Sequence, residues 1–569
     1  MFDLNSLVRK SIKEMKPYSR PSILPVQVKL NQNESPYNLP KEVLDEFQRR
    51  LVRTQFNLYN EGSSEVLRNA LASKFKLVPN QFIVGCGIDE IFYYVLLAFV
   101  NPGDKLVRPS PSFSMYEICA KIAGAVDCPV QLDENFELTQ EFVEQSKTAK
   151  ITFICRPNNP TANSWSKATI EEIIKGTSGL VLIDEAYVEF AKETCIDFLK
   201  YPNVVLLRTF SKAYSSASVR LGYGISSVGI VNYLNRVRLP WNVNIMAQLF
   251  GEIALAYDYL FSQKIEQIKV DRESLLTEVR KIVKVFPSDS NFFLFEVNNP
   301  AKVYQKLFSL GVLVRSVSSY PMLGSCLRAN VGTPDENATF VSALKKAVSE
   351  VDAVIFDIDG VLIDVSKSYR EAIIRTVKQF TGKSIVDRDV DALKQLPGFN
   401  NDWDSCYALC KGIIDPKQVD RTSSDYQQMK DYFQLQYLGE LIKKEKSLVQ
   451  LKTLDDLSNR GLKFGVVTGR PREEAIIALR TAGITPKYIR NENIIAQEDA
   501  PEKPSPEPLL LAQRKLAAKN PVYVGDSTSD KLAAERAQML FVFCKNASKS
   551  EPNFEFITIN SVNVLPKVI

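Results

Sequence analysis

The sequence predicts an α/β fold in two parts. At 569 residues the chain is too long for one ordinary domain, because a single hydrophobic core stops growing at about 250–300 residues. Short apolar segments that end at polar turns recur along the chain, as they do in open sheets covered by helices. This pattern restarts abruptly at residues 351–369, without a linker rich in Gly, Ser or Pro. We therefore expect one part over residues 1–350 and another over residues 351–569.

The composition is typical of a soluble globular protein, with 45% hydrophobic and 24% charged residues. The net charge of +5 is small for this length and gives no reason to expect a nucleic acid or an acidic membrane as partner. The N-terminus lacks the apolar core of a signal peptide, and the best apolar run, residues 91–100, is too short to span a bilayer and predicts a buried helix. Nine scattered cysteines without a CxxC pair indicate a reducing, cytoplasmic setting.

Histidine is absent from the chain. This absence excludes histidine triads, imidazole general bases and histidine metal ligands. The chemistry of the protein must then depend on carboxylates, lysine, hydroxyl groups, a cofactor or hard cations.

The most informative segment is LLRTFSKAYSSASVRLGYG, which includes the end of a predicted strand. It carries Thr209, Ser211 and Lys212, with Arg220 eight residues after the lysine. Two hydroxyl groups, a lysine and an arginine on a tight turn can hold a phosphate-bearing aldehyde covalently.

Two other segments support a phosphate-bearing ligand. A predicted strand at Phe82–Val84 meets Gly85 and Gly87 and is followed by a helix, so backbone N–H groups and a helix N-terminus can approach a phosphate. In LVLIDEAYVEF a second strand ends at Asp184, three residues before Tyr187. Ligands of open α/β sheets collect at such strand ends.

In this order and spacing, these segments resemble the fold type I aminotransferases that use pyridoxal 5'-phosphate, and the histidinol-phosphate aminotransferase family in particular. The resemblance implies a large mixed-sheet α/β domain at about residues 46–249. It also implies a small α+β domain built from about residues 1–45 and 250–350, small-molecule substrates and a homodimer.

The resemblance further implies roles for individual residues. Lys212 would bind the cofactor aldehyde, Asp184 would keep the pyridine nitrogen protonated, and Asn159 would bond the ring hydroxyl. Tyr116 is expected to stack on the cofactor ring, and Tyr59 to reach the cofactor phosphate of the neighbouring subunit. The full set of expected cofactor contacts is Tyr59, Gly87, Ile88, Asp89, Tyr116, Asn159, Asp184, Tyr187, Thr209, Ser211, Lys212 and Arg220.

Three residues are expected to bind the substrate of this part. Asn33 lies in VKLNQNESPYNLPKEV, Arg315 in GVLVRSV and Arg328 in CLRANVGTPDEN. The two arginines would receive the anionic groups, because guanidinium binds carboxylate and phosphate in a bidentate manner. The alternatives are a surface arginine at Arg315, a packing residue at Tyr59 and a core aromatic at Tyr116.

The second part carries four separate polar strand ends or loops. A predicted strand leads to Asp357 and Asp359 in VIFDIDG, and later segments supply Thr468 in VVTGRP, Lys503 in APEKPSP and Asp526 in VYVGDSTSD. This ordered set resembles the haloacid dehalogenase superfamily of phosphotransferases, which implies a Rossmann-like domain.

That resemblance implies a mechanism. Asp357 would be the nucleophile that forms an aspartyl-phosphate, and Asp359 the general acid and then the base. Thr468 and Lys503 would hold the phosphoryl oxygens. Asp357, Asp359 and Asp526, with a backbone carbonyl, would offer Mg²⁺ the oxygen shell that it prefers, and Asp530, four residues after Asp526, would orient that shell.

A mostly helical insert at about residues 366–445 resembles the superfamily's helical cap, which closes over small phosphate esters. Its most polar and aromatic stretch is GFNNDWD, residues 398–404. We expect this stretch to carry substrate specificity; a packing turn within the cap is the alternative.

Together, the two resemblances predict a bifunctional enzyme of histidine biosynthesis. It would transfer an amino group between histidinol phosphate and 2-oxoglutarate, and hydrolyse a phosphate monoester with Mg²⁺. Histidinol phosphate is the candidate for that monoester because of the fusion, not because of a motif. An aromatic aminotransferase or a threonine-phosphate decarboxylase is the alternative for the first part. A phosphatase of different specificity or a non-catalytic binding module is the alternative for the second.

Overall fold

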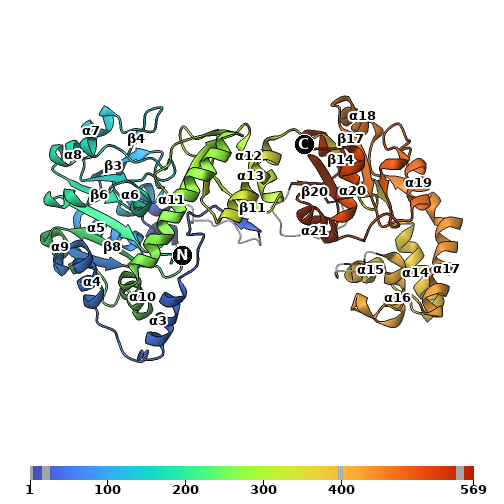
Figure 1. Cartoon of the computed structure of the whole chain (residues 1–569), viewed down its shortest axis with the longest axis horizontal. Coiled ribbons are helices and arrows are strands. Elements are labelled where there is room, and N and C mark those ends of the chain that lie inside the picture. The colour runs from blue at the N-terminus through green and yellow to red at the C-terminus, as the bar shows by residue number, and fades with distance from the viewer. Residues whose placement is uncertain are drawn as a thin grey trace. The chain divides into compact units, whose positions relative to one another are not determined.

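The computed structural model describes residues 4–13, 15, 26–394, 396, 399, 401–545 and 557–569 (Figure 1). It confirms the predicted α/β fold class. The chain forms two compact units, one of residues 1–304 and 313–342 and the other of residues 305–312 and 343–569. The finer division of residues 1–350 into a large and a small domain stays a prediction.

A seven-stranded mixed sheet forms the centre of the first unit. Its strands are β2 (Phe82–Gly85), β3 (Lys105–Ser110), β4 (Val126–Gln131), β5 (Ile151–Cys155), β6 (Leu180–Asp184), β7 (Val204–Thr209) and β8 (Gly222–Ser226). Their order is β2-β8-β7-β6-β5-β3-β4, with β8 antiparallel to both neighbours and the other neighbours parallel. Strands β5, β7 and β8 are buried along their whole length, as expected for a sheet covered on both faces.

Helices surround this sheet in Figure 1. The first unit contains α1 (Leu4–Leu7), α2 (Lys10–Lys13), α3 (Lys41–Leu51), α4 (Glu65–Phe75), α5 (Ile88–Phe99), α6 (Met115–Ala123), α7 (Gln140–Ser146), α8 (Lys167–Gly176), α9 (Val228–Val237), α10 (Ile245–Ala256) and α11 (Asp258–Arg280). The predicted buried helix over residues 91–100 is α5, which starts three residues earlier, directly after Gly87. Within the described ranges, no helix combines the length and the apolar composition that crossing a membrane requires.

A smaller antiparallel sheet carries the predicted substrate arginines. It consists of β9 (Lys284–Val285), β10 (Phe292–Glu296), β12 (Arg315–Ser316) and β13 (Cys326–Asn330), in the order β12-β13-β10-β9. Helices α12 (Pro300–Ser309) and α13 (Pro334–Val348) follow these strands along the chain, and β1 (Val28–Lys29) forms a separate pair with β11 (Val312–Leu313).

The second unit is built on a six-stranded parallel sheet. Its strands are β14 (Ala353–Phe356), β17 (Lys463–Val467), β18 (Ile494–Ile495), β19 (Pro521–Gly525), β20 (Leu540–Cys544) and β21 (Thr558–Ile559), in the order β18-β17-β14-β19-β20-β21. Strand β14 pairs with β17 on one side and β19 on the other. The residues that follow these three strands therefore meet at one edge of the sheet. The helices of this part are α18 (Leu451–Asn459), α19 (Arg472–Thr481), α20 (Glu507–Leu516) and α21 (Thr528–Arg536).

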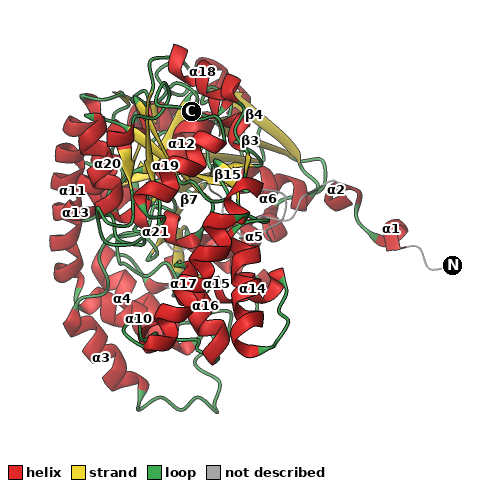
Figure 2. Cartoon of the chain, turned by 90° about the vertical axis from the view of Figure 1, so that its right-hand side faces the viewer, coloured by secondary structure: helices red, strands yellow, loops and turns green. Residues whose placement is uncertain are grey.

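The predicted helical cap is confirmed. It contains α14 (Tyr369–Thr381), α15 (Asp387–Lys394), α16 (Asp402–Lys411) and α17 (Ser424–Gly439), which lie together in Figures 1 and 2. The rings of Tyr369, Phe433 and Tyr437 stack in its core. The chain enters and leaves the cap beside an antiparallel pair of two-residue strands, β15 (Ile363–Asp364) and β16 (Lys446–Ser447).

Candidate active sites

Three of the predicted cofactor contacts, Gly87, Asp89 and Arg220, meet at the N-terminus of α5. Gly87 precedes the helix with a φ of 77°, a backbone conformation that favours glycine, and a Cβ there would lie 3.0 Å from Arg220 Nη2. Arg220 arrives from the loop after β7, and its Nη2 lies 3.2 Å from Asp89 Oδ2. Ile88 begins the helix and offers its backbone N–H. A helix N-terminus beside a guanidinium suits a phosphate.

Thr209 and Ser211 lie in the turn that carries Lys212, and both are buried. Thr209 Oγ1 accepts the N–H of Ser211 at 3.1 Å and donates to the carbonyl of Leu221 at 3.2 Å. The threonine hydroxyl therefore stabilises the turn. The contact of these two hydroxyls with a phosphate stays a prediction.

Lys212 has the properties of a reactive lysine. Its Nζ donates to the carbonyl of Gln32 at 2.9 Å and lies 5.8 Å from the ring centroid of Tyr187. Burial, and next to it the positive charge of Arg328, lowers the pKa of Lys212 to about 8. Near neutral pH a larger fraction of this amine is therefore neutral, which is the form that attacks a carbonyl.

The depressed pKa predicts how Lys212 reacts with pyridoxal phosphate. We expect the rate for the cofactor-free protein to rise with pH and to reach half its maximum near pH 8, as stopped-flow absorbance would show. Arg328→Gln removes a positive charge and should move that midpoint upward. A midpoint at about 10, where an ordinary lysine titrates, would contradict the prediction.

Asp184 ends β6 and is 2% exposed. Its Oδ2 accepts the hydroxyl of Tyr116 at 2.8 Å, and its Oδ1 accepts the N–H of Ala186 at 3.0 Å. Burial raises the pKa of Asp184 to about 6, and the two hydrogen bonds oppose that rise. A buried carboxylate of this kind fits a protonated pyridine nitrogen, which would supply the missing positive charge.

The prediction that Tyr116 stacks on the cofactor ring is wrong. Tyr116 is 0% exposed, and its ring lies parallel to that of Phe153, with the centroids 4.6 Å apart and 12° between the planes. A side chain without exposed surface cannot stack on a ligand, and this one instead holds Asp184. Phe113 is partly exposed and meets Tyr116 edge-on at 5.7 Å, so it is the better candidate for stacking.

Tyr116→Phe should raise the pKa of Asp184 further, because it removes a hydrogen bond to the charged carboxylate. We expect the affinity of cofactor-free protein for pyridoxal phosphate to fall as pH drops through 6, and the variant to move this transition up by about one pH unit. Fluorescence titration of the dissociation constant against pH measures the shift. Tyr201→Phe, whose hydroxyl bonds Glu171, serves as the control. An unshifted transition in the Tyr116 variant would contradict the assignment.

Asn33, Asn159, Tyr187 and Arg328 form one polar cluster next to Lys212. The Tyr187 hydroxyl oxygen accepts from Asn33 Nδ2 at 3.0 Å and from Asn159 Nδ2 at 3.5 Å. Arg328 Nη1 donates to Asn159 Oδ1 at 2.5 Å. Burial raises the pKa of Tyr187, which keeps its proton available for donation to a ligand.

Two amide oxygens in this region fit a site that a ligand completes. Asn31 and Asn33 are 5% and 1% exposed, and their Oδ1 atoms have no hydrogen-bond partner within the described part of the chain. Buried acceptors are rarely left without a partner. Asn31, whose carbonyl accepts Arg328 Nη2 at 3.0 Å, was not predicted from the sequence, although it stands two residues before Asn33.

Arg315 and Arg328 are directly paired across β12 and β13. Opposite residues of an antiparallel pair point to the same face of the sheet. Arg328 is 8% exposed and Arg315 is half-buried, so two guanidinium groups share one face. Their contact with a substrate stays a prediction.

Tyr59 is not a buried packing residue. It is 83% exposed, and its ring stacks on Trp241 with the centroids 4.5 Å apart. Its surface is therefore available to another molecule, and its contact with the cofactor of a second subunit stays a prediction.

In the second unit Asp357 follows β14 and is 7% exposed. Lys503 Nζ lies 3.1 Å from Asp357 Oδ1 and 2.6 Å from Asp530 Oδ1. Burial raises the pKa of Asp357 well above its usual range, against the pull of the lysine. For Asp530 the lysine and the hydrogen bonds from Ser527 and Tyr523 outweigh burial and lower the pKa.

Asp357, Asp526 and Asp530 offer carboxylate oxygens that all lie within 4.8 Å of one another. Three carboxylates around one point fit Mg²⁺, a hard cation with oxygen ligands. Both oxygens of Asp530 already accept hydrogen bonds, Oδ1 from Lys503 and Tyr523 and Oδ2 from Ser527, so Asp357 and Asp526 are the side chains that would hold the ion. Gly360 has a φ of 77°, and a Cβ there would lie 2.1 Å from Asp526 Oδ2, so glycine is required for this approach.

The Asp359 carboxylate does not belong to this group of three, and the contact of Asp359 with Mg²⁺ stays a prediction. The Asp359 carboxylate turns to Arg470, whose Nη2 and Nε lie 2.5 Å and 2.9 Å from Oδ1. Arg470 itself was not predicted, although it stands two residues after Thr468 in TGR.

Thr468 and Lys503 remain candidates for binding phosphoryl oxygens. Thr468 follows β17 and is 5% exposed, and its Oγ1 accepts the N–H of Arg470 at 3.2 Å. Strand β17 neighbours β14, so Thr468 and Asp357 lie at adjacent strand ends. The contacts of both residues with a phosphate stay predictions.

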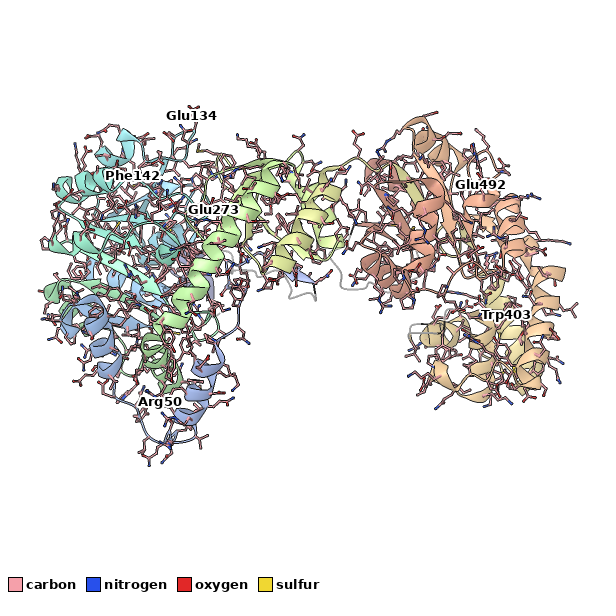
Figure 3. All side chains as sticks on the ribbon, viewed as in Figure 1. Arg50, Glu134, Phe142, Glu273, Trp403 and Glu492 are labelled. Carbon is pink, nitrogen blue, oxygen red and sulfur yellow. The ribbon has the colours of Figure 1, made fainter. Side chains whose placement is uncertain are left out.

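Within GFNNDWD, Gly398 and Asn400 lie outside the described residues. Trp403, labelled in Figure 3, belongs to α16, and it packs against the cap core with Lys430 Nζ 4.0 Å from its ring centroid. This packing role is the alternative considered for the segment. A role of residues 398–404 in specificity stays a prediction.

The comparisons with known proteins give a family for each part of the chain. Residues 25–344 match the family model described as aminotransferase class I and II, and residues 354–544 match the model described as haloacid dehalogenase-like hydrolase. Fold and sites therefore define a pyridoxal phosphate-dependent transferase joined to a hydrolase of the Mg²⁺-dependent phosphatase class. This confirms the two predicted enzyme classes and their two cofactors.

The relatives of the first part specify its family. The histidinol-phosphate aminotransferase of Thermoanaerobacter sp. (strain X514) is 38% identical over 349 residues, which are 60% of this chain and 99% of that protein. The histidinol-phosphate aminotransferase of Aquifex aeolicus is 37% identical over 356 residues, or 61% of this chain and 99% of that protein. The chain belongs to the histidinol-phosphate aminotransferase family.

Solved structures share the fold. The crystal structure of the histidinol-phosphate aminotransferase from Clostridium acetobutylicum has a TM-score of 0.53 at 24% identity and covers 56% of this chain and 98% of its own. That of the enzyme from Sinorhizobium meliloti in complex with pyridoxal-5'-phosphate has a TM-score of 0.56 at 21% identity and covers 60% of this chain and 98% of its own.

Proposed function

We propose that the first unit transfers an amino group between histidinol phosphate and 2-oxoglutarate, and that the second unit hydrolyses a phosphate monoester, with histidinol phosphate as the first substrate to test. The observation that supports the proposed transamination is the 38% identity to a histidinol-phosphate aminotransferase, over 99% of that protein's length. The likeness to an L-threonine-O-3-phosphate decarboxylase, at 23% identity, extends to the fold alone.

The residues of the first unit have separate tasks in this proposal. Pyridoxal phosphate, when bound, supplies an electron-withdrawing ring. Lys212 supplies the amine that holds the cofactor and the base that moves a proton at the substrate carbon. Asp184 holds the ring nitrogen, and Asn159 with Tyr187 orients the ring hydroxyl. The paired Arg315 and Arg328 bind the anionic groups of the substrate.

The residues of the second unit support hydrolysis in two steps. Asp357 Oδ bonds to phosphorus while the ester P–O bond breaks, and Asp359 gives its proton to the leaving alkoxide. Asp359 then takes a proton from water, the water oxygen bonds to phosphorus, and the bond to Asp357 breaks. Mg²⁺ at Asp357 and Asp526 would neutralise charge on the phosphoryl group, as would Lys503.

A homodimer belongs to the same proposal. The loop around the 83% exposed Tyr59 also exposes Val52 (87%), Phe56 (60%) and Leu58 (60%). Apolar side chains gathered on one loop favour contact with another protein surface. We propose that this loop contacts a second copy of the chain and brings Tyr59 to its cofactor. Sedimentation should show a dimer; a monomer with full transaminase activity would exclude the role of Tyr59.

The experiment that tests the function is a coupled assay on the intact chain with pyridoxal phosphate and Mg²⁺. Histidinol phosphate and 2-oxoglutarate are added, and glutamate and free phosphate are followed separately. Formation of both supports the whole proposal. Glutamate without phosphate would direct the second unit to a screen of other monoesters, and phosphate alone would mean that the substrate of the transaminase lies elsewhere.

A further inference from the structure

Arg470 is a buried cation between the acid–base candidate and the cap. It is 2% exposed and lies in the loop between β17 and α19. Its guanidinium contacts two carboxylates, Asp359 on the catalytic loop and Glu445 at the end of the cap. Burying a guanidinium is costly unless its donors are paired, and here the partners come from two different structural elements.

The contacts of Arg470 with the two oxygens of Asp359 are unequal. Nη2 and Nε lie 2.5 Å and 2.9 Å from Oδ1, whereas Nε lies 3.3 Å from Oδ2. Oδ1 is thus anchored and Oδ2 is left weakly bound, on a side chain that is 33% exposed. A carboxyl group held through one oxygen can still carry and release a proton at the other.

The far side of Arg470 is fixed by the cap. Its Nη2 and Nη1 lie 3.0 Å and 3.1 Å from Glu445 Oε1 and Oε2, and Nη1 donates to the hydroxyl of Tyr437 at 2.8 Å. Its Cζ lies 4.6 Å from the ring centroid of Tyr369.

Glu445 also joins the two segments that connect the cap to the sheet. It stands directly before β16, where the chain leaves the cap, and its Oε1 accepts the hydroxyl of Ser368, where the chain enters the cap, at 2.9 Å. The orientation of Arg470 therefore depends on the conformation of both connections.

We propose that Arg470 is the positioning residue of the phosphatase site. It anchors Oδ1 of Asp359, so that Oδ2 exchanges the proton with the leaving alcohol and the attacking water. Glu445 makes the orientation of Arg470 depend on the two segments that connect the cap to the sheet. This inference rests on the proposed phosphatase function. Arg470 itself forms and breaks no covalent bond. A misplacement of a catalytic group by 1 Å can reduce a rate by about 100-fold.

The test compares two substrates that differ in their need for a proton. An alkyl phosphate, such as glycerol 2-phosphate, needs proton donation to its alkoxide, whereas p-nitrophenyl phosphate has a weakly basic leaving group and needs little. We expect Arg470→Gln to lower kcat about 100-fold for the alkyl ester but less than about 5-fold for the aryl ester, with KM changed less than about 3-fold. Arg470→Lys keeps the charge but loses the planar fork, so it should recover only part of kcat.

Arg472→Gln is the matched control, because this partly exposed arginine is two residues away and pairs with Asp499 instead. It should behave like the parent chain with both esters. Glu445→Gln should lower kcat for the alkyl ester about 10-fold alone and have almost no further effect in the Arg470→Gln background, since it acts through Arg470. Thermal unfolding of each variant confirms that it is folded.

An equal loss with both esters, or a raised KM at unchanged kcat, would overturn the positioning role while the phosphatase function stands. Additive losses in the double variant would overturn the link to the cap. If the parent chain releases no phosphate from either ester or from histidinol phosphate in the presence of Mg²⁺, the proposed phosphatase function and the positioning role fail together.

Discussion

Asp357→Asn is expected to abolish release of phosphate, by a factor on the order of 10⁴ or more, and to leave transamination unchanged. Asparagine has nearly the same shape as aspartate, but its amide is not a nucleophile and is a poorer ligand for Mg²⁺. Asp357 lies beside Lys503 and within the cluster of three carboxylates, so the change removes the nucleophile and one metal ligand together. Phosphate and glutamate are measured in the same preparation.

Asp364→Asn is the matched control for this experiment. Asp364 follows the same loop, but its Oδ1 accepts the N–H of Ser366 at 3.0 Å, and it lies outside the carboxylate cluster. It should retain phosphate release. In addition, Mg²⁺ should raise the thermal midpoint of the parent chain more than that of Asp357→Asn, because binding to the folded state stabilises it. Substantial phosphate release by Asp357→Asn would exclude Asp357 as nucleophile.

Lys212→Arg is expected to lower transamination by a factor on the order of 10⁵ or more and to leave phosphate release unchanged. Arginine keeps the positive charge beside Tyr187 and Gln32, but at ordinary pH it has no neutral amine to react with an aldehyde. The loss should appear in the glutamate assay and in the visible absorption of the bound cofactor.

Lys281→Arg is the corresponding control, because this lysine lies at the end of α11 with 63% of its side chain exposed. It should behave like the parent chain. Reduction with borohydride followed by peptide mass analysis identifies the lysine that carries the cofactor. Cofactor found on a lysine other than Lys212 would refute the assignment, whatever the activity of the variant.

The positions of strand ends in both sites could be predicted from the sequence. The prediction that Asp184 ends a strand was correct to the residue, and the strand predicted to lead to Asp357 is β14, which ends at Phe356. Short apolar runs and the polar residues that follow them are local features of the chain, so the sequence is sufficient to locate them. The glycine at position 87 was likewise informative, because its φ of 77° is a local requirement.

The partners of these residues were harder to predict. Tyr116 was assigned to the cofactor, but it lies flat against Phe153 and bonds Asp184, 68 residues away. An aromatic residue that follows a strand has the same neighbours in the sequence whether its ring contacts a ligand or packs in the core. Only packing between distant segments separates the two cases.

By itself, the sequence determined the fold class, the order of the two enzymatic parts and the helical cap, because periodicity and strand-end motifs are encoded over a few consecutive residues. The tertiary structure alone decided which charges meet. Asp359 pairs with Arg470, 111 residues further along the chain, whereas the Asp530 carboxylate lies with those of Asp357 and Asp526. The energies of buried charges depend on distance and desolvation, and both are set by the packing of elements remote in sequence.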